Sequence, residues 1–467
     1  MRGREFPMKR IYVLLCAAIT GLSGIPKAAH AELTAFAEEE QVFQGMTYII
    51  DDGFAVITGY TAALPDELTI PAKIESYAVW YIQDDAFLDC SQLKRVTVSS
   101  NAIIGKAFRN CSNLECVVLP DTVTQIRASA FENCTALTEI NIPSGISRIP
   151  DKLLSGCKSL KAIQIPDTIT EIGALAFENC TGLTEIVIPE SVQSIQSMAF
   201  SGCSNLTAVQ IPETTDVSGD ALNGTAWLTA KQAEDPLVML SGILLNGTQA
   251  KGEVTVPDGV TGLSKYSFFE SAVSGIVIPA STTKIGSYAF RNCTELSSVT
   301  ILGNIGNLSA VDMTAGKRTK GAIEIFKGCS NLREITVLNP FCDFDPMIQR
   351  VPTGAVIRGY ENSSAQKNAE KWGTFYQFES LGEAPEQMTG DFDGDGEITE
   401  KDAQGVLNAY TDVVAGGESA LMPQQVRACD IDGDGAVKAA DAQYILVYFT
   451  ENTLSHKAVT WEEILPQ

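Results

Sequence analysis

The chain has 467 residues, of which 45% are hydrophobic, and its mean hydropathy is +0.07. This length allows two or three domains with a large buried core, and this composition argues against wholesale disorder. The net charge of −24 at pH 7 disfavours nucleic acid and anionic membrane surfaces as partners, because like charges repel.

The first 31 residues are typical of a secretory signal peptide. A basic start that includes Arg2 and Arg10 precedes an apolar run over 11–25, and Ala29-His30-Ala31 has the A-x-A pattern of a cleavage site. The apolar run is too short to span a bilayer comfortably, and no later segment has the length of a membrane helix. We therefore predict a signal peptide over 1–31 and a secreted, extracellular protein without a membrane span.

A repeat with a period of 23 residues occupies most of the chain. In the unit over 172–189, Ile186 and Ile188 alternate as in a short strand, and Pro189 ends the strand because it has no N–H to donate. The stretch over 176–180 makes a turn or short helix. One unit cannot bury its apolar side alone, so stacked units must share one core. The period is carried by Cys111, Cys134, Cys157, Cys180 and Cys203, and by Phe108, Phe131, Phe177 and Phe200, with Leu154 in the one missing place.

The cysteines form a predicted column of one thiol per repeat. Twelve cysteines in an exported protein would ordinarily suggest disulfides. Strands about 4.8 Å apart bring the cysteines of the column close, but their side chains point in parallel, which disfavours the geometry of a disulfide. We therefore expect most of them to be buried free thiols.

Two stretches interrupt the period and predict insertions near 213–250 and 302–322. The first contains Trp227 and two apolar runs, over 237–240 and 243–245, followed by the turn signal Asn246-Gly247. We interpret it as a repeat that carries a protruding hairpin. Trp227 is a candidate recognition residue, against the more common case of a tryptophan that packs on its own repeat.

The repeats resemble the cysteine-bearing, 23-residue BspA-like leucine-rich repeats of bacteria over residues 46–380. The resemblance implies an α/β leucine-rich-repeat solenoid with an N-terminal cap over 32–83, repeats over 84–339 and a C-terminal cap over 340–380. It also implies a surface for adhesion or for binding protein or cell-wall material, and it transfers no catalytic residue.

The outward positions of the predicted strands form a column without an aromatic residue. Glycan-binding platforms usually stack sugar rings on aromatic faces, so this column is a poor carbohydrate platform. Its members are Thr97, Val118, Asn141, Gln164, Val187, Gln210, Val277, Thr300 and Thr336.

Two acidic loops follow a linker over 381–389. Each has twelve residues, with aspartate at places one, three, five and twelve and glycine at place six, where the chain must turn sharply. This spacing wraps a hard cation in oxygen ligands, and the residue at place seven coordinates through its carbonyl. We therefore predict two calcium ions that also help the module to fold. The candidate ligands are Asp391, Asp393, Asp395, Glu397 and Asp402 in the first loop, and Asp430, Asp432, Asp434, Ala436 and Asp441 in the second.

Aspartate at place twelve and the lack of a helix before the first loop depart from an ordinary EF-hand and resemble the dockerin family over residues 390–467. The resemblance implies a small all-α dockerin module with docking helices over 402–414 and 440–450 and a connecting helix over 419–428. Dockerins bind cohesin modules of scaffold proteins in cellulosome-type complexes that degrade cell-wall polysaccharides. The chain would then be held at a cellulosome or cell surface through a scaffold.

The dockerin resemblance also assigns candidate cohesin contacts by motif position. The two halves differ in charge and size, which predicts a single binding orientation in which the apolar second helix supplies much of the contact area. An alternative places Leu446 and Val447 in the core of the module. The candidates are Glu400, Lys401, Leu407 and Asn408 in the first half, and Ala439, Ala440, Leu446 and Val447 in the second.

Dockerins are often attached to enzymes, so catalysis was weighed against binding. Beyond the predicted signal peptide the chain has one histidine, His456, which argues against Ser-His, Cys-His and His-metal chemistry in the repeats. The alternative is a dockerin-bearing glycoside hydrolase with an unrecognised carboxylate pair. Glu139, Glu185 and Glu334 lie on the outer strand column, but a solvated acidic face explains them better. We therefore expect a non-catalytic component with no catalytic residues.

Overall fold

The computed structural model describes residues 40–305, 311–312, 319–320, 324–342, 344–346, 349–385, 387–415, 421 and 423–465. The predicted signal peptide lies outside the described residues. The chain divides into two compact units, of which the first comprises residues up to 169 together with 179–186, and the second comprises 170–178 and 187 onwards.

The first unit begins with an antiparallel meander that continues into parallel strands. The order β1-β2-β3-β6-β5 defines its first sheet, and β6 also pairs with the two-residue strand β8. A second sheet has the order β10-β9-β7-β4, and all three of its pairings are parallel. The bounds are β1 Gln41–Phe43, β2 Met46–Asp51, β3 Phe54–Tyr60, β4 Glu67–Ile70, β5 Lys73–Ile74, β6 Tyr77–Ile82, β7 Arg95–Val98, β8 Ile103–Ile104, β9 Cys116–Val118, β10 Glu139–Ile140 and β11 Arg148–Ile149.

Successive repeats contribute strands to two ladders rather than one. The predicted strand forms the first ladder, in which Cys116 pairs with Glu139 one period later. Short strands elsewhere in the repeats form the second ladder. In the first unit this ladder runs from β6 through β8 to the bridge between Ile104 and Ile126. The sequence analysis did not predict this second ladder, because two residues are too few for an alternating pattern to be visible.

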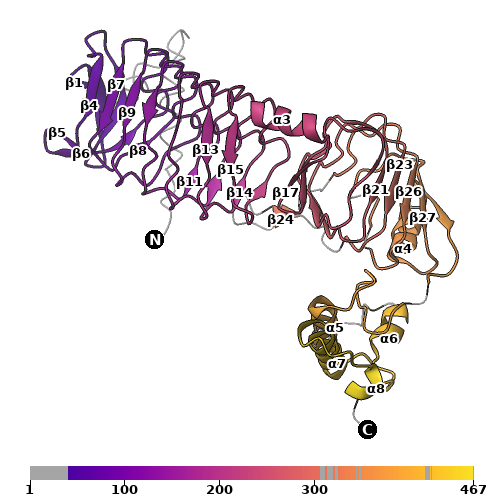
Figure 1. Cartoon of the computed structure of the whole chain (residues 1–467). Coiled ribbons are helices and arrows are strands. Elements are labelled where there is room, and N and C mark those ends of the chain that lie inside the picture. Colours follow the sequence, from indigo (N-terminus) through magenta and orange to yellow (C-terminus); the bar gives the residue numbers. More distant parts are fainter. Residues whose placement is uncertain are drawn as a thin grey trace, which may run out of the picture. The chain divides into compact units, whose positions relative to one another are not determined.

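The second unit contains the same two ladders (Figure 1). The first ladder runs in the order β19-β21-β23-β26-β27-β28, and the second runs through β12-β14-β16 and again through β18-β20-β22. The bounds are β12 Glu171–Ile172, β13 Glu185–Val187, which lies at the boundary of the units, β14 Ser194–Ile195, β15 Ala208–Gln210, β16 Asp216–Val217, β18 Ile243–Asn246, β19 Lys251–Thr255, β20 Gly262–Leu263, β21 Ala272–Ile278, β22 Lys284–Ile285, β23 Ser298–Ile301, β26 Glu334–Val337, β27 Val356–Gly359 and β28 Gln377–Ser380.

The first predicted insertion contains a helix as well as the expected hairpin. Helix α3 (Ala226–Glu234) includes Trp227 and begins after Thr225, whose hydroxyl accepts a hydrogen bond from the N–H of Leu228. Strand β17 (Val238–Leu240) then pairs antiparallel with β18, so the hairpin turns at Ser241 and Gly242. A turn also follows the second strand, as Asn246-Gly247 predicted, because β18 ends at Asn246 and the N–H of Ala250 donates to the carbonyl of Gly247 at 3.0 Å. The Asn246 side chain is fully buried and donates to the carbonyl of Gly219.

The second predicted insertion is described only in part. Strands β24 (Val311–Asp312) and β25 (Thr319–Lys320) pair antiparallel. Further along, helix α4 (Ser364–Lys371) lies between β27 and β28 and buries Ala365 and Ala369. The C-terminal region has helices α5 (Glu400–Val414), α6 (Pro423–Cys429) and α7 (Ala439–Phe449), a π-helical turn, η1 (Thr450–Leu454), and α8 (Trp461–Ile464).

Columns of phenylalanine fill the interior of the repeats. In the first unit the rings of Phe87 and Phe108 stack with centroids 5.0 Å apart, and Phe131 follows Phe108 at 5.4 Å. In the second unit Phe177 and Phe200 stack at 5.1 Å. Offset aromatic pairs at these separations add about 0.5–1.5 kcal/mol each beyond the burial of their area. The identical spacing of the sequence therefore becomes runs of stacked rings between neighbouring repeats.

The cysteine column satisfies buried carbonyls. The Cys111 thiol donates to the carbonyl of Phe87 at 3.1 Å, and the Cys134 thiol donates to that of Phe108 at 3.2 Å. The same contact recurs with Cys203 and Phe177 in the second unit, at 3.0 Å. All eleven described cysteines are free and buried, which confirms the prediction of packed thiols. Cysteine fits this place because it is small and apolar yet carries a weak S–H donor.

Removing one ring from the phenylalanine column is expected to be costly. Phe108 is fully buried between two other rings, so Phe108→Ala should lower the free energy of unfolding in urea by about 3–5 kcal/mol. Phe375, which is 41% exposed, provides the control, and Phe375→Ala should cost roughly 1 kcal/mol or less. Equal losses for the two variants would contradict a stabilising stack.

The thiols should be unreactive in the folded chain. Burial raises the pKa of Cys157 to about 12, and the thiolate is the form that attacks a disulfide reagent. With residues 1–31 removed, Ellman's reagent at pH 8 should titrate fewer than one thiol per chain within minutes, and all eleven described cysteines after denaturation. Fast labelling of several thiols without unfolding would show that the column is open to solvent.

Candidate calcium-binding and docking site

The predicted ligands converge in both acidic loops. In each loop the carboxylates at places one, three and five offer oxygens that lie within 4.8 Å of one another. These are Asp391, Asp393 and Asp395 in the first loop, and Asp430, Asp432 and Asp434 in the second. Three hard, anionic oxygens at this separation suit a calcium ion, which prefers carboxylate and carbonyl ligands.

Backbone N–H groups hold the carboxylates in place in the same way in both loops. The N–H of place six donates to the carboxylate of place one, at 3.0 Å from Gly396 to Asp391 and at 2.9 Å from Gly435 to Asp430. Both glycines have φ of +88°, a left-handed conformation that other residues rarely adopt. The pattern of the sequence therefore produces two loops with the same local structure.

The aspartate at place twelve closes each loop. The carboxylate of Asp402 accepts the N–H groups of Phe392 and Thr399, each at 2.8 Å. Asp441 accepts those of Ile431 and Lys438 at 2.8 and 2.7 Å. Each aspartate thus ties the start of its loop to the first turn of the following helix, where a negative charge also interacts favourably with the helix dipole. A shorter aspartate suits this double contact in the place where an EF-hand has glutamate.

Negative charge is costly in the first loop, mainly because burial removes water from its carboxylates. Burial, together with the neighbouring carboxylates, raises the pKa of Asp391 to about 6 and that of Asp393 to about 7. Burial likewise raises the pKa of Asp402 and of Asp441. Buried carboxylates that cannot all be charged at once favour either protons or a divalent cation.

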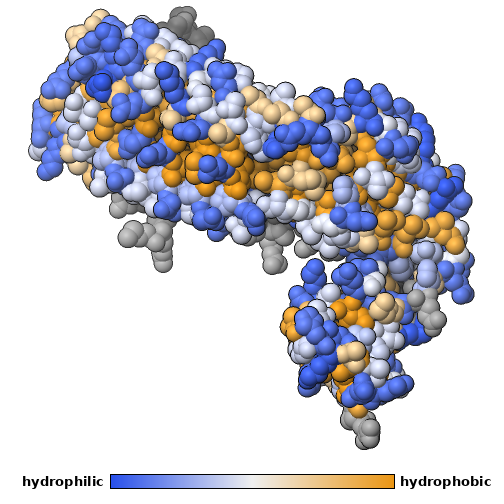
Figure 2. All heavy atoms as spheres, viewed as in Figure 1, coloured by the Kyte–Doolittle hydropathy of each residue, from blue (hydrophilic) through white to orange (hydrophobic). Residues whose placement is uncertain are grey.

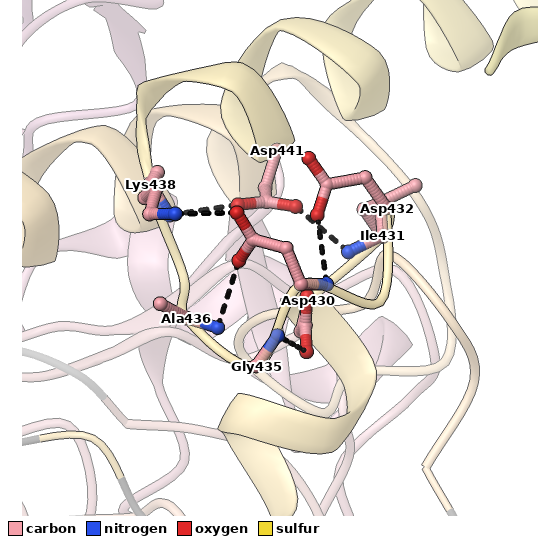
Figure 3. A network of polar contacts seen from close by, with 8 residues as sticks. Asp430, Ile431, Asp432, Gly435, Ala436, Lys438 and Asp441 are labelled. Carbon is pink, nitrogen blue, oxygen red and sulfur yellow. Dashed lines mark hydrogen bonds and ion pairs between the residues drawn. The ribbon is translucent and has the colours of Figure 1, made fainter. Parts of the chain in front are cut away.

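The second loop differs through Lys438 (Figure 3). The Lys438 ammonium pairs with the Asp434 carboxylate and lowers its pKa. The Oδ1 atom of Asp430 is buried and has no hydrogen-bond partner among the described residues. A buried anionic oxygen without a donor is costly, and a cation at this loop would satisfy it. The donor set therefore fits calcium, although the ion must compete with Lys438 for Asp434.

All eight candidate cohesin contacts are on the surface of the module. Glu400, Lys401, Leu407, Asn408, Ala439, Leu446 and Val447 are exposed and Ala440 is half-buried. Leu446 is 46% exposed, and Ile445 beside it is fully buried. The alternative that placed Leu446 and Val447 in the core is therefore wrong, because α7 turns Ala442 and Ile445 inward instead. Apolar patches are visible on the surface of this module in Figure 2.

The starts of both docking helices differ from the sequence prediction. They begin at Glu400 and Ala439, because Thr399 and Lys438 are the N-cap residues. The described part of the connecting helix is α6, which begins at Pro423, and its predicted start at residue 419 is not among the described residues. Residues 416–420 lie outside the described residues.

Sequence analysis missed a contact that joins the two ends of the module. The ring of Trp461 in α8 stacks on Tyr448 of α7 with centroids 4.1 Å apart. It also lies against Gly390, where an added Cβ would come within 2.6 Å of the indole. Gly390 is therefore required for close packing beside the first loop. The signal in the sequence was the single tryptophan of the C-terminal tail.

Comparison with protein families agrees with this geometry. A model of the BspA type leucine rich repeat region matches six copies over residues 101–229 and 245–314, and a model of the dockerin type I domain matches residues 389–449. The chain thus contains BspA-type leucine-rich repeats and a C-terminal dockerin type I domain. Dockerin type I domains bind calcium and imply a cohesin partner, and leucine-rich repeats imply a protein-binding surface.

Solved structures with similar folds are bacterial leucine-rich-repeat proteins. A protein from T. pallidum is 26% identical and covers 42% of this chain and 95% of its own, with a TM-score of 0.38. One from Bacteroides ovatus is 21% identical over 73% of this chain and 99% of its own, with a TM-score of 0.37. A leucine rich cell surface protein from Faecalibacterium prausnitzii is 21% identical over 74% and 96%, with a TM-score of 0.33. A search of curated proteins found no significant match.

Among the helices that the structure describes, none is both long and apolar enough to cross a membrane.

Calcium affinity should fall as the pH falls from 8 to 5.5. The raised pKa values of Asp391 and Asp393, about 6 and 7, mean that the metal-free loop gains protons in this range, and calcium must displace them. We expect at least about a tenfold loss of affinity at pH 5.5. Isothermal titration at pH 6.5 in two buffers of different ionisation enthalpy should also detect proton release.

One substitution tests the assignment of the loop, and a second serves as its control. Asp391→Asn should weaken calcium binding at pH 8, whereas Asp412→Asn on the exposed side of α5 should leave it unchanged. An affinity that is independent of pH, or an equal effect of the two substitutions, would contradict the assignment of the loop.

Proposed function

We propose that this chain is a secreted, non-catalytic component of a cellulosome-type assembly. Its dockerin domain attaches it to the cohesin of a scaffold protein when two calcium ions occupy the loops, and its leucine-rich repeats present a binding surface. The observation that carries the proposal is the convergence of three carboxylates in each of two loops that lead directly into α5 and α7.

The ions would act on the partner through the two helices. Asp402 lies at the end of the first loop and in the first turn of α5, and Asp441 has the same place in α7. A cation that fixes the loops also fixes where these helices start. The two helices share a core that includes Val406 and Ile445, so the exposed residues beside that core keep their relative positions. We assign the calcium ligands to the ten loop residues named above.

The cohesin would contact the outward side of the docking helices. Leu446 and Val447 of α7 are 46% and 39% exposed, and Leu407 of α5 is 38% exposed. Exposed apolar side chains on two helices that pack together support an interaction surface there. Among the eight candidate contacts, Leu446 and Val447 are adjacent apolar residues, which supports one preferred orientation through the second helix, with Lys401 adding specificity.

The predicted signal peptide and the acidic composition support a role outside the cell, where calcium is abundant. A non-catalytic role is supported by the two families, neither of which is catalytic. Glu334, one of the outer carboxylates named above, forms an ion pair with Arg358 at 2.7 Å. Such a pair is expected on a solvent-exposed surface of mixed charge.

The experiment is capture of the full chain by a panel of cohesins with calcium and with EDTA. Capture should require calcium, and Leu446→Glu should weaken it at least about tenfold, as for a central contact residue. Leu407→Glu should have a smaller effect if the second helix dominates. Leu454, which is 66% exposed in the π-helical turn after α7, provides the matched control.

Capture that persists in EDTA would refute the calcium-dependent attachment. Equal losses for Leu446→Glu and Leu454→Glu would refute the assigned surface. Hydrolysis of cell-wall polysaccharide that is abolished by replacing one surface glutamate would refute the non-catalytic role.

A further inference from the structure

The first unit has a groove whose charge is opposite to that of the chain. The groove has a volume of about 440 Å³, within the range of about 300–1,000 Å³ usual for ligand pockets. Its ionisable lining residues are Lys106, Arg127 and Arg148, and no acidic residue lines it. The chain as a whole has 57 acidic residues against 33 basic ones, so three cations around one groove are a local exception.

The groove lies on the outward face of the second ladder. Its floor includes Ile126 and Ile146, both buried, and Ile126 bridges to Ile104 of β8 within the ladder. The short polar side chains of Thr124, Gln125 and Ser147 also line it. The groove thus combines an apolar floor, hydroxyl and amide groups, and cations.

An aromatic cluster adjoins the groove through Arg127, which is one of its lining residues. The Arg127 guanidinium lies 5.2 Å from the centre of the Tyr81 ring, and that ring lies 5.9 Å from Trp80. Phe54 follows at 6.1 Å from Trp80 and is 42% exposed. Phe54, Trp80, Tyr81 and Arg127 therefore form one connected surface, which we call the aromatic strip.

A β-bulge in β6 creates this strip. Val79 pairs with Ala55 and Tyr81 pairs with Val56, so Trp80 is an extra residue. Val79 and Ile82 are buried whereas Trp80 and Tyr81 are partly exposed, so two successive aromatic side chains share the outer face. Alternation in a regular strand would have turned one of them into the core. Bulges often redirect side chains in this way at functional sites.

Two of the groove cations also have acidic neighbours. Arg127 lies 3.2 Å from Asp84, and Arg148 lies 2.7 Å from Asp151, with all four side chains between about one third and one half exposed. Exposed ion pairs of this kind are weak. They hold the guanidinium groups in position and leave them able to bind a further anion from solvent.

From this combination we infer that the groove and the aromatic strip bind an oligosaccharide of carboxylate-bearing sugars, that is, a uronic-acid chain. Guanidinium and ammonium groups bind the sugar carboxylates, with arginine matching a carboxylate in two-point contact. Aromatic faces pack on the sugar rings. An acidic peptide fits less well, because the groove lies along paired strands and offers no free strand edge for a peptide backbone.

This inference deepens the proposed function, since it names a ligand class for the repeat surface, and it concerns a different face from the aromatic-free column of the first ladder. Attachment through the dockerin and recognition through the groove can fail separately. Cohesin capture of the same protein sample therefore shows which of the two has failed.

The test is isothermal titration of the full chain with tetragalacturonate at low salt. Binding is expected, and it should weaken severalfold in 0.5 M NaCl because the charges are exposed. Lys106→Gln and Arg148→Gln should each weaken it about two- to fivefold, and Phe54→Ala should also weaken it. Lys94→Gln provides the control, because Lys94 is a similarly exposed cation that pairs with Asp66 and does not line the groove.

Three further ligands complete the test. Methyl-esterified tetragalacturonate and neutral cellotetraose should bind at least about tenfold more weakly, and equal binding would overturn the role of the cations. Poly-glutamate that binds as well as the sugar acid would overturn the choice of an oligosaccharide. No detectable binding of tetragalacturonate, or an equal loss with Lys94→Gln, would overturn the site while calcium-dependent cohesin capture persists. Unchanged circular dichroism and melting temperature of each variant exclude unfolding as the cause.

Discussion

A single 23-residue repeat cannot bury its own apolar side chains, and the structure of the repeats follows from this constraint. Most rungs present a phenylalanine, a cysteine and several aliphatic residues to their neighbours at the same places. The ring of Phe108 stacks on those of the preceding and following rungs, and the thiol of Cys111 satisfies a carbonyl of the preceding rung. Packing between neighbours therefore provides both the hydrophobic contacts and the hydrogen bonds that a rung lacks alone.

The dockerin domain solves the opposite problem, because its small core must coexist with clustered negative charge. Its buried core comprises Ala403, Val406, Ala428, Cys429, Ile431, Ala442 and Ile445. Beside it, each loop brings together carboxylates that raise one another's free energy when all are ionised. A divalent cation converts that repulsion into a cross-link. We therefore expect calcium to contribute to the folding of this domain and not to that of the phenylalanine-filled repeats.

The parts that sequence could predict are those in which one residue type is required at one spacing. The residue types of Cys134 and Phe131 recur because neighbouring rungs pack in the same way, with Leu154 replacing the ring once. Asp391 and Gly396 stand where a twelve-residue loop requires an oxygen ligand and a left-handed turn. Fold class, the cysteine column and the loop positions were accordingly visible. Leu446 was assigned to the docking surface by motif position. Its side chain is exposed because the neighbouring Ile445 is the residue that α7 buries in the core.

The parts that sequence could not predict depend on contacts between distant segments. The second ladder consists of two-residue strands, which leave no periodic pattern. Helix α3 was not predicted, because the apolar runs that follow it were interpreted as a hairpin alone. The bulge at Trp80 exists only in the register of β6 against β3. Trp461 meets Gly390 across the whole dockerin domain, and no local pattern connects two residues so far apart.

Departures from the repeat are therefore where recognition is best sought. The inward positions of every rung are fixed by the shared core and cannot vary without loss of packing. The outward positions are free of that constraint, so a groove lined by Lys106, Arg127 and Arg148 in an acidic chain is not a by-product of stacking. The same holds for two aromatic rings turned outward by one extra residue. A solenoid can thus keep one interior throughout its length and still carry a distinct binding surface on part of one face, while the calcium-dependent domain supplies attachment by separate physical means.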